Sequence, residues 1–91
     1  MKEWIAALRS GKYKQVKWRL KTDDGFCALG VLRDIQGARW IKDGDDWVTE
    51  EGELSILQIF FPLDDLQQEE IMVLNDSGHT FDEIADWLEA L

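Results

Sequence analysis

Apolar positions near the start of the chain recur at helical spacing. Trp4, Ile5 and Leu8 fall on one side of a helix that we expect over about residues 2–10. Gly11 follows at a position where helices commonly end, because glycine adopts the left-handed backbone conformation without strain. The first element is therefore predicted to be a short amphipathic helix.

The next segment, residues 15–21, alternates strictly between apolar and polar side chains. Val16, Trp18 and Leu20 share one face, and the other face carries a glutamine and three basic residues. This period of two predicts a half-buried strand whose apolar face packs on the core. Residues 22–25 contain two aspartates and a glycine, which predicts a turn after the strand.

Residues 26–35 are apolar on nearly every side, and their length favours a buried central helix over a strand. Gly30 within this segment would allow another part of the backbone to approach closely. Asp23 or Asp24 is expected to cap the start of the helix, and Gly37 is expected to end it.

The dipeptide Asp43-Gly44 lies between two short runs of strand-forming residues. Asp-Gly is favoured in two-residue hairpin turns, where both residues need positive φ. We therefore expect residues 39–48 to form a β-hairpin. A turn at this dipeptide pairs Lys42 with Asp45 and Trp40 with Trp47 across the two strands.

The acidic second half of the chain contains further helix signals. Residues 54–61 are expected to form a short helix or turn that contributes to the core and stops at Pro62. Asp64 and Gln67 have the spacing of a capping box, which predicts a helix over about residues 65–74.

Thr80 and Glu83 repeat the capping-box spacing and open a last helix that continues to the end of the sequence. Its two faces differ in character, because one is apolar and the other carries carboxylates. The apolar face comprises Phe81, Ile84, Ala85, Leu88 and Leu91.

These elements predict an α+β fold with about four helices and a minor antiparallel sheet or hairpin, in a single domain over residues 1–91. Five tryptophans and four phenylalanines are expected to dominate the core, because each buried ring removes about 150–250 Å² from water. The predicted core comprises Trp4, Ile5, Leu8, Val16, Trp18, Leu20, Phe26, Leu29, Val31, Leu32, Ile35, Leu57, Phe60, Ile71, Leu74, Phe81, Ile84 and Leu88.

The charges divide the chain into a basic and an acidic part. Residues 2–42 hold all ten lysines and arginines and four acids, a net charge of +6. Residues 43–91 hold fifteen acids and no lysine or arginine, a net charge of −15. The overall charge of −9 disfavours direct binding to duplex DNA, whose phosphates would be repelled. The acidic part either complements the basic part within the molecule or mimics the charge of a nucleic acid and is presented to a basic groove on another protein.

The sequence argues against catalysis and against a metal site. Nucleophilic catalysis usually sets a cysteine or serine beside a histidine. The only cysteine, Cys27, lies in the apolar helix, and the only histidine, His79, lies in a turn where we expect it to be exposed. Residues 43–46 are acidic but lack the spacing of a calcium-binding EF-hand loop. We expect no catalytic residue, no metal and no cofactor.

The sequence also contains features that bear on cellular compartment and membrane association. A single cysteine allows no intramolecular disulfide, and no secretory signal opens the sequence. The longest uncharged stretch, residues 54–63, is too short to span a bilayer. We therefore expect a cytoplasmic protein without a membrane partner.

Three motifs occur together, namely WIAALRSGKYKQ at residues 4–15, CALGVL at residues 27–32 and LNDSG at residues 74–78. In these motifs the chain resembles a group of small bacteriophage and prophage proteins with the pattern Trp-x-x-Ala-Leu-Arg-Ser-Gly-x-Tyr-x-Gln, then Cys-Cys-Leu-Gly-Val-Leu and Leu-Asn-Asp. Ala28 stands where that group often has a second cysteine, which argues against a redox or metal role for Cys27. The resemblance implies a phage-encoded cytoplasmic accessory protein and no particular activity.

Basic residues are interleaved with aromatic ones between Arg9 and Lys21, a composition found in nucleic-acid and phosphate sites. The cations form either a solvated face or an anion site, and Trp18 is expected to point into the core. Tyr13 and Gln15 either line a ligand pocket or anchor the turn by hydrogen bonds. The candidate anion- or ligand-binding residues are Arg9, Lys12, Tyr13, Gln15 and Arg19.

Three functions remain open. The favoured one is a non-enzymatic phage-type accessory protein that binds and inhibits or modulates a bacterial host protein, such as a nucleic-acid-binding defence factor. The second is a small-molecule or nucleotide binder that uses the basic segment, and the third is a self-assembling module that docks basic part on acidic part. The oligomeric state stays open. The candidate partner-binding acids are Asp64, Asp65, Glu69, Glu70, Asp82, Glu83, Asp86 and Glu89.

Overall fold

The computed structural model describes residues 2–44, 46–49 and 63–91. In chain order its elements are α1 (Lys2–Arg9), β1 (Lys21–Thr22), β2 (Gly25–Phe26), α2 (Ala28–Ile35), β3 (Trp40–Asp43), β4 (Asp46–Thr49), α4 (Asp65–Asp76) and α5 (Phe81–Glu89). The described residues thus form four helices and a four-stranded antiparallel sheet, so the predicted α+β fold is confirmed. The helix or turn predicted at residues 54–61 lies outside the described residues.

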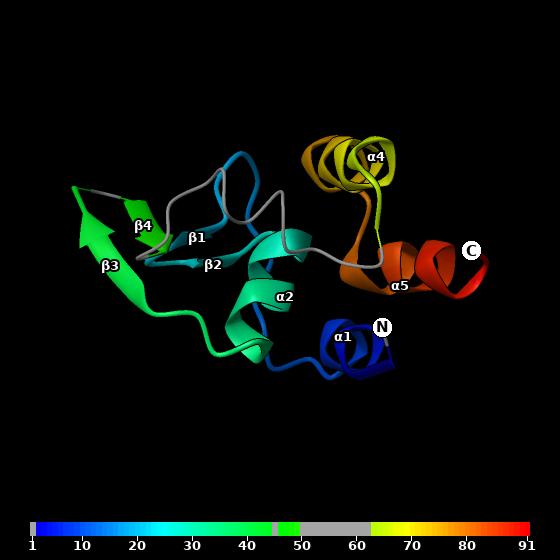
Figure 1. The fold of residues 1–91 in the computed structure, drawn as a ribbon, viewed down its shortest axis with the longest axis horizontal. Coiled ribbons are helices and arrows are strands. Elements are labelled where there is room, and N and C mark those ends of the chain that lie inside the picture. The colour runs from blue at the N-terminus through cyan, green and yellow to red at the C-terminus, as the bar shows by residue number, and fades with distance from the viewer. Residues whose placement is uncertain (1, 45, 50–62) are drawn as a thin grey trace.

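The helices and the sheet occupy different ends of the molecule (Figure 1). The helix α1 packs on both α2 and α5, and α2 packs on α4. The sheet has the strand order β2-β1-β4-β3 and adjoins α2 through β2. The helices α1 and α5 therefore lie side by side, and α2 lies between the other three helices and the sheet (Figure 1).

The predicted starts of α4 and α5 are confirmed. The Asp64 carboxylate accepts a hydrogen bond from the Gln67 backbone N–H (2.8 Å), and the Gln67 side chain accepts one from the Asp64 N–H (3.1 Å). Thr80 and Glu83 form the same reciprocal pair at the start of α5. Such capping boxes satisfy amide groups that the first turn of a helix leaves without an intrahelical partner.

The predicted N-cap of α2 is wrong, whereas Gly37 ends the helix as expected, with a φ of 85°. Cys27 is the N-cap residue, and its Sγ accepts a hydrogen bond from the Gly30 N–H at 3.4 Å. Asp23 and Asp24 lie instead in the turn between β1 and β2. There the Asp23 carboxylate accepts hydrogen bonds from the Lys42 ammonium, so it is used to hold the sheet together rather than the helix.

The strand predicted over residues 15–21 is also wrong. Gln15 forms an isolated parallel bridge with Phe26, and only Lys21 of this segment lies in a strand, β1 (Lys21–Thr22). Trp18 has a φ of 71°, in the left-handed region that residues other than glycine seldom adopt. Because the chain turns at this residue, Val16 and Leu20 are half-buried, whereas Trp18 is 73% exposed. The predicted core position of Trp18 is therefore a further correction.

Residues 14–20 form a loop that is fixed at both ends by backbone hydrogen bonds. The Phe26 N–H donates to the Lys14 carbonyl (2.8 Å), and the Cys27 N–H donates to the Leu20 carbonyl (3.0 Å). A Cβ atom at Gly30 would overlap the Leu20 carbonyl, so the close approach of two backbones predicted at this glycine is confirmed. The loop thus rests directly on the start of α2.

The hairpin of β3 and β4 forms as predicted but in a different register. Lys42 lies opposite Trp47, whereas the expected turn pairs Lys42 with Asp45 and Trp40 with Trp47. A shift of two residues leaves every side chain on the same face, so the alternation of the sequence fits both registers. In the observed register the Lys42 ammonium and the Trp47 indole N–H both donate hydrogen bonds to Asp23. These contacts favour the observed register over the expected one.

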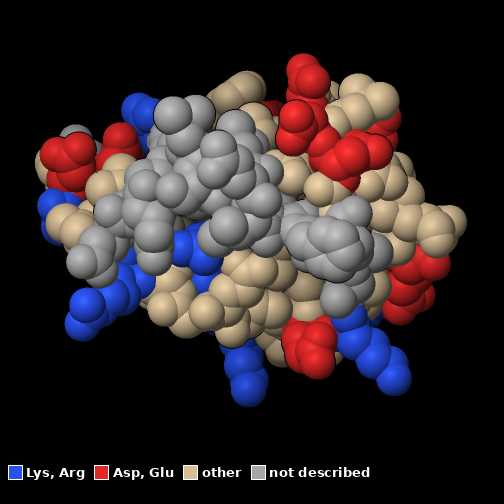
Figure 2. Space-filling view, viewed as in Figure 1, with Lys and Arg blue, Asp and Glu red and all other residues tan. Residues whose placement is uncertain are grey.

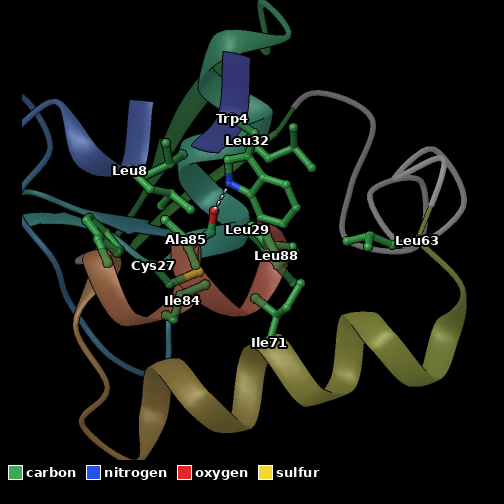
Figure 3. Close-up of a cluster of buried hydrophobic side chains, with 13 residues drawn as sticks. Trp4, Leu8, Cys27, Leu29, Leu32, Leu63, Ile71, Ile84, Ala85 and Leu88 are labelled. Atoms are coloured by element: carbon green, nitrogen blue, oxygen red, sulfur yellow. Dashed lines mark hydrogen bonds between the residues drawn. The ribbon is translucent and has the colours of Figure 1, made fainter. Parts of the chain in front are cut away.

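The core lies between α1, α2, α4 and α5 (Figure 3). Trp4 is 1% exposed, and its indole N–H donates to the Ala28 carbonyl at 2.9 Å. The predicted core residues that are buried are Trp4, Leu8, Leu29, Val31, Leu32, Ile71, Phe81, Ile84 and Leu88. The predicted core residues that are half-buried are Ile5, Val16, Leu20, Phe26 and Leu74.

Two further apolar predictions need correction. Ile35 is 37% exposed and Leu91 is 55% exposed, because each lies at or beyond the last turn of its helix, where the buried face ends. Leu57 and Phe60 lie outside the described residues. The buried set also contains polar side chains that hydrophobic patterning does not identify, among them Gln68 and Asn75.

Candidate functional site

Gln15 joins the loop before β1 to the C-terminal helices. Its Nε2 donates hydrogen bonds to Asn75 Oδ1 (2.9 Å) and to the His79 carbonyl (2.8 Å). Its Oε1 accepts one from the Phe81 N–H (3.1 Å), which is an amide at the start of α5. The side chain therefore connects parts of the chain that lie more than sixty residues apart.

Asn75 is the buried centre of this network, with 1% exposure. Its Oδ1 accepts from Gln15 and from the Ala28 N–H (3.1 Å). Its Nδ2 donates to the Val16 carbonyl (2.9 Å) and to Asp76 (3.3 Å). Both donors and both acceptor sites of the amide are thus used, as expected for a polar group removed from water.

Tyr13 has a comparable anchoring contact. Its hydroxyl donates to Asp34 at 2.6 Å, and its ring packs edge-on against Phe26. Burial, the hydrogen bond to Asp34 and the charge of that carboxylate raise the pKa of Tyr13 to about 12. Of the two roles that the sequence leaves open for Tyr13 and Gln15, the structure therefore shows the anchoring hydrogen bonds.

The remaining candidate ligand residues have different surroundings. Arg9 binds Asp86 (2.6 Å) and Glu89 (3.4 Å) on α5. Arg19 is exposed and binds the half-buried Asp46 of β4 (3.0 Å), and Lys12 is exposed. Their cationic groups are therefore distributed over several elements rather than directed at one common point.

All eight candidate partner-binding acids are exposed, but they differ in what they contact. Asp64 and Glu83 cap their helices, and the backbone N–H of Thr80 holds the pKa of Glu83 below its usual value. Asp86 and Glu89 are paired with Arg9, as described above. Among the described residues, no lysine or arginine pairs with the other four acids, which are Asp65, Glu69, Glu70 and Asp82.

The outer face of α4 combines these carboxylates with exposed apolar side chains. Leu66 is 64% exposed and Val73 is 60% exposed, and their spacing of seven residues places one above the other on the helix. Glu69 and Glu70 lie between them in sequence, to either side of this apolar stripe. Figure 2 shows carboxylates gathered at the upper right, over α4, and at the right edge near the end of α5.

The acids of this face were predicted from the sequence, whereas Leu66 and Val73 were not. The usable signal was the seven-residue spacing of Leu66 and Val73, which places both of them off the helix face that carries Ile71 and Leu74. The buried face instead contains Gln68, Ile71 and Asn75, which displaces apolar residues to the solvent side. We call Leu66, Glu69, Glu70 and Val73 the α4 outer face.

A second surface feature surrounds Trp18. A cavity of about 240 Å³ lies between the loop, β4 and α4, with Trp18, Trp47 and Met72 among its lining residues. The Trp18 N–H donates to the Asp76 carboxylate at 2.9 Å, so α4 holds the loop in its turned conformation. The chain thus displays an exposed aromatic ring beside a hollow.

The two groups considered for catalysis, Cys27 and His79, have different surroundings. Cys27 is buried and 7% exposed, while His79 is exposed and lies 3.6 Å from Glu83. Within the described ranges no group of three or more histidine, cysteine, aspartate or glutamate side chains is placed to hold a metal ion. Burial raises the pKa of the Cys27 thiol to about 11.

This pKa predicts slow thiol chemistry at Cys27. At about pH 8 only roughly one thiol in a thousand is ionised when its pKa is about 11, and the thiolate is the reactive form. We expect the folded protein to react with an aromatic disulfide reagent at least about 100-fold more slowly than the protein in denaturant. Stopped-flow absorbance measures both rates, and the native rate should keep rising with pH up to about 11. Equal rates in the two states would contradict the burial of this side chain.

No helix in the described part of the chain is both long enough and apolar enough to cross a membrane.

Comparison with known proteins identifies the family of the chain. No curated protein and no solved structure matches the sequence. One family model, described as a domain of unknown function (DUF8296), matches residues 1–60, which include α1, α2 and all four strands. Because this match covers well over half of its length, the chain belongs to the DUF8296 family.

Proposed function

We propose that this protein is a non-enzymatic binding protein that docks the α4 outer face on a basic surface of another protein. The supporting observation is that Glu69 and Glu70 have no basic partner among the described residues and lie beside the exposed Leu66 and Val73. Apolar side chains surrounded by charged ones have the composition of a protein–protein contact, with a dry centre and a polar rim.

The charges of this face favour a partner rich in lysine and arginine. Asp65 and Asp82 extend the unpaired negative charge along α4 and onto the start of α5. Complementary charge mainly accelerates association and selects among partners, while buried apolar contacts slow dissociation. Together with the resemblance to phage and prophage proteins, this supports a bacterial host protein that itself binds nucleic acid as the partner, which the protein would inhibit or modulate by occupying its basic surface.

Affinity capture from bacterial lysate at about 50 mM salt tests this proposal. A host protein retained by the wild-type chain should be lost, at least about tenfold, with Glu69→Lys/Glu70→Lys, because charge reversal turns attraction into repulsion. Asp24→Lys/Asp43→Lys makes the same change in net charge away from α4 and should retain the partner. Leu66→Ala/Val73→Ala should bind more weakly without losing the salt dependence.

The capture experiment contradicts the proposal under either of two results. In the first, the wild-type chain retains no host protein that is lost with Glu69→Lys/Glu70→Lys and kept with Asp24→Lys/Asp43→Lys. In the second, the α4 variant and the control variant lose the same partner equally, which would show that only the net charge of −9 matters.

A further inference from the structure

Trp18 is displayed at a position that the stability of the fold does not explain. It is the only described residue other than glycine with a positive φ, and its ring is 73% exposed. A bulky residue in this backbone conformation is strained, and such strain persists only where surrounding contacts enforce it. An exposed ring contributes little to the core in return, so strain and exposure together indicate a binding role.

The enforcing contacts come from the end of α4. Asp76 accepts a hydrogen bond from the Trp18 N–H, and Asn75 donates one to the Val16 carbonyl. Both contacts act on the backbone, so they fix the turn without covering the ring. Asp76 is half-buried and also accepts from Asn75, so its charge is engaged with N–H groups of the protein.

The loop and the residues before it carry cationic side chains. Lys14 and Lys17 of the loop and Lys12 just before it are exposed, and within the described residues none of them pairs with a carboxylate. Lys17 directly precedes Trp18, and Arg19 directly follows it. Arg19 is exposed and pairs with the half-buried Asp46, and an ion pair open to solvent on one side contributes little and can exchange for another anion.

We propose that this loop, residues 14–20, binds single-stranded nucleic acid. The exposed face of Trp18 stacks on an unpaired base, and the neighbouring lysines bind the flanking phosphates. Aromatic rings among cations are the usual platform for single strands, because every base offers a face for stacking. A duplex hides those faces, so the ring has nothing to stack on. The net charge of −9 also repels the denser phosphate charge of a duplex more strongly than that of a single strand. This site is separate from the α4 outer face and does not depend on the proposed function.

Fluorescence anisotropy with fluorescein-labelled dT12 and rU12 at about 50 mM salt tests the site. We expect saturable binding to one or both oligonucleotides and weaker binding to a duplex of the same length. Trp18→Gly should weaken binding by about tenfold, because one stacked base is lost. Glycine suits the positive φ, so this variant should fold at least as well as the wild type, which thermal melting checks. Trp18→Phe should retain most of the affinity.

A matched pair of lysine variants tests the phosphate contacts. Lys17→Gln should weaken binding and reduce the slope of log K against log salt by about 0.7, the value for one phosphate contact on a single strand. Lys2→Gln removes the same charge from α1 and should leave the slope unchanged. The site is rejected if the wild type shows no binding, if Trp18→Gly binds as tightly as the wild type, or if Lys2→Gln and Lys17→Gln change the slope equally.

Discussion

Replacing Asn75 with alanine is expected to lower the free energy of unfolding by about 3–5 kcal/mol. The substitution leaves the Val16 carbonyl, the Ala28 N–H and one N–H of the Gln15 side chain without their partner. Each buried polar group that loses its hydrogen bond costs about 1–3 kcal/mol, and partial access of water to Gln15 keeps the sum below the maximum. Urea unfolding followed by tryptophan fluorescence measures the change.

Met72→Ala is the control for the Asn75 variant. It changes the same helix at a side chain that is 42% exposed, so the expected loss is within about 1 kcal/mol. Asn75→Asp keeps an acceptor oxygen, but the ionised carboxylate has no donor for the Val16 carbonyl. Protonation restores an O–H donor, so the stability of this variant should lie between those of Asn75→Ala and the wild type only at a pH low enough to protonate the carboxyl group. A loss below about 1 kcal/mol for Asn75→Ala would show that the network contributes little.

Replacing Trp4 with alanine is expected to cost about 3–5 kcal/mol as well, for a different reason. The ring is 1% exposed at the contact of α1 with α2, and removing a large buried side chain leaves a cavity that the neighbours fill only partly. Since small domains have total stabilities of about 5–15 kcal/mol, this variant should melt at a much lower temperature. Thermal unfolding by circular dichroism measures the effect.

Two variants separate the contributions of Trp4. Trp4→Phe keeps most of the apolar ring and loses the N–H that donates to the Ala28 carbonyl, so its expected cost is about 1–2 kcal/mol. Trp18→Gly removes an exposed tryptophan and should cost nothing or stabilise the fold slightly, because it relieves the positive φ. If the two tryptophan deletions had equal effects, the assignment of Trp4 to the core would be wrong.

Local chemistry made the starts of α4 and α5 and the end of α1 predictable. The capping boxes at Asp64 and Thr80 are decided by side chains three residues apart, and both appear in the structure. Gly11 likewise ends α1 with a φ of 75°. In each case the residues that determine the element lie within it, so the amino-acid sequence of a short window is sufficient.

Distant contacts made the loop before β1 unpredictable. Val16, Trp18 and Leu20 alternate with polar residues as a strand would, but Asn75 and Asp76 hold this backbone in a turn. Nothing in the segment reveals partners nearly sixty residues away. The alternation therefore predicted a core position for Trp18, and only the folded structure shows that this ring is exposed.

The acidic surface was predicted only in part. The exposed carboxylates of α4 and α5 follow from helical periodicity, which is a local property. The pairing of Arg9 with Asp86 depends instead on the packing of the first helix against the last. For that reason the sequence could identify the acids but could not distinguish the ones that the molecule neutralises from the ones it leaves to solvent.

The packing of α1 against α5 has a consequence for synthesis in the cell. A growing chain of sixty residues already contains Trp4 and Gln15 but not Asn75 or Ile84, which they need to become ordered. The apolar stripe of α1 stays open to chaperones, proteases and other nascent chains until α5 has been translated. Folding of the described residues is therefore a late event that brings α1 and α5 together, and we expect these contacts of long sequence separation to slow it.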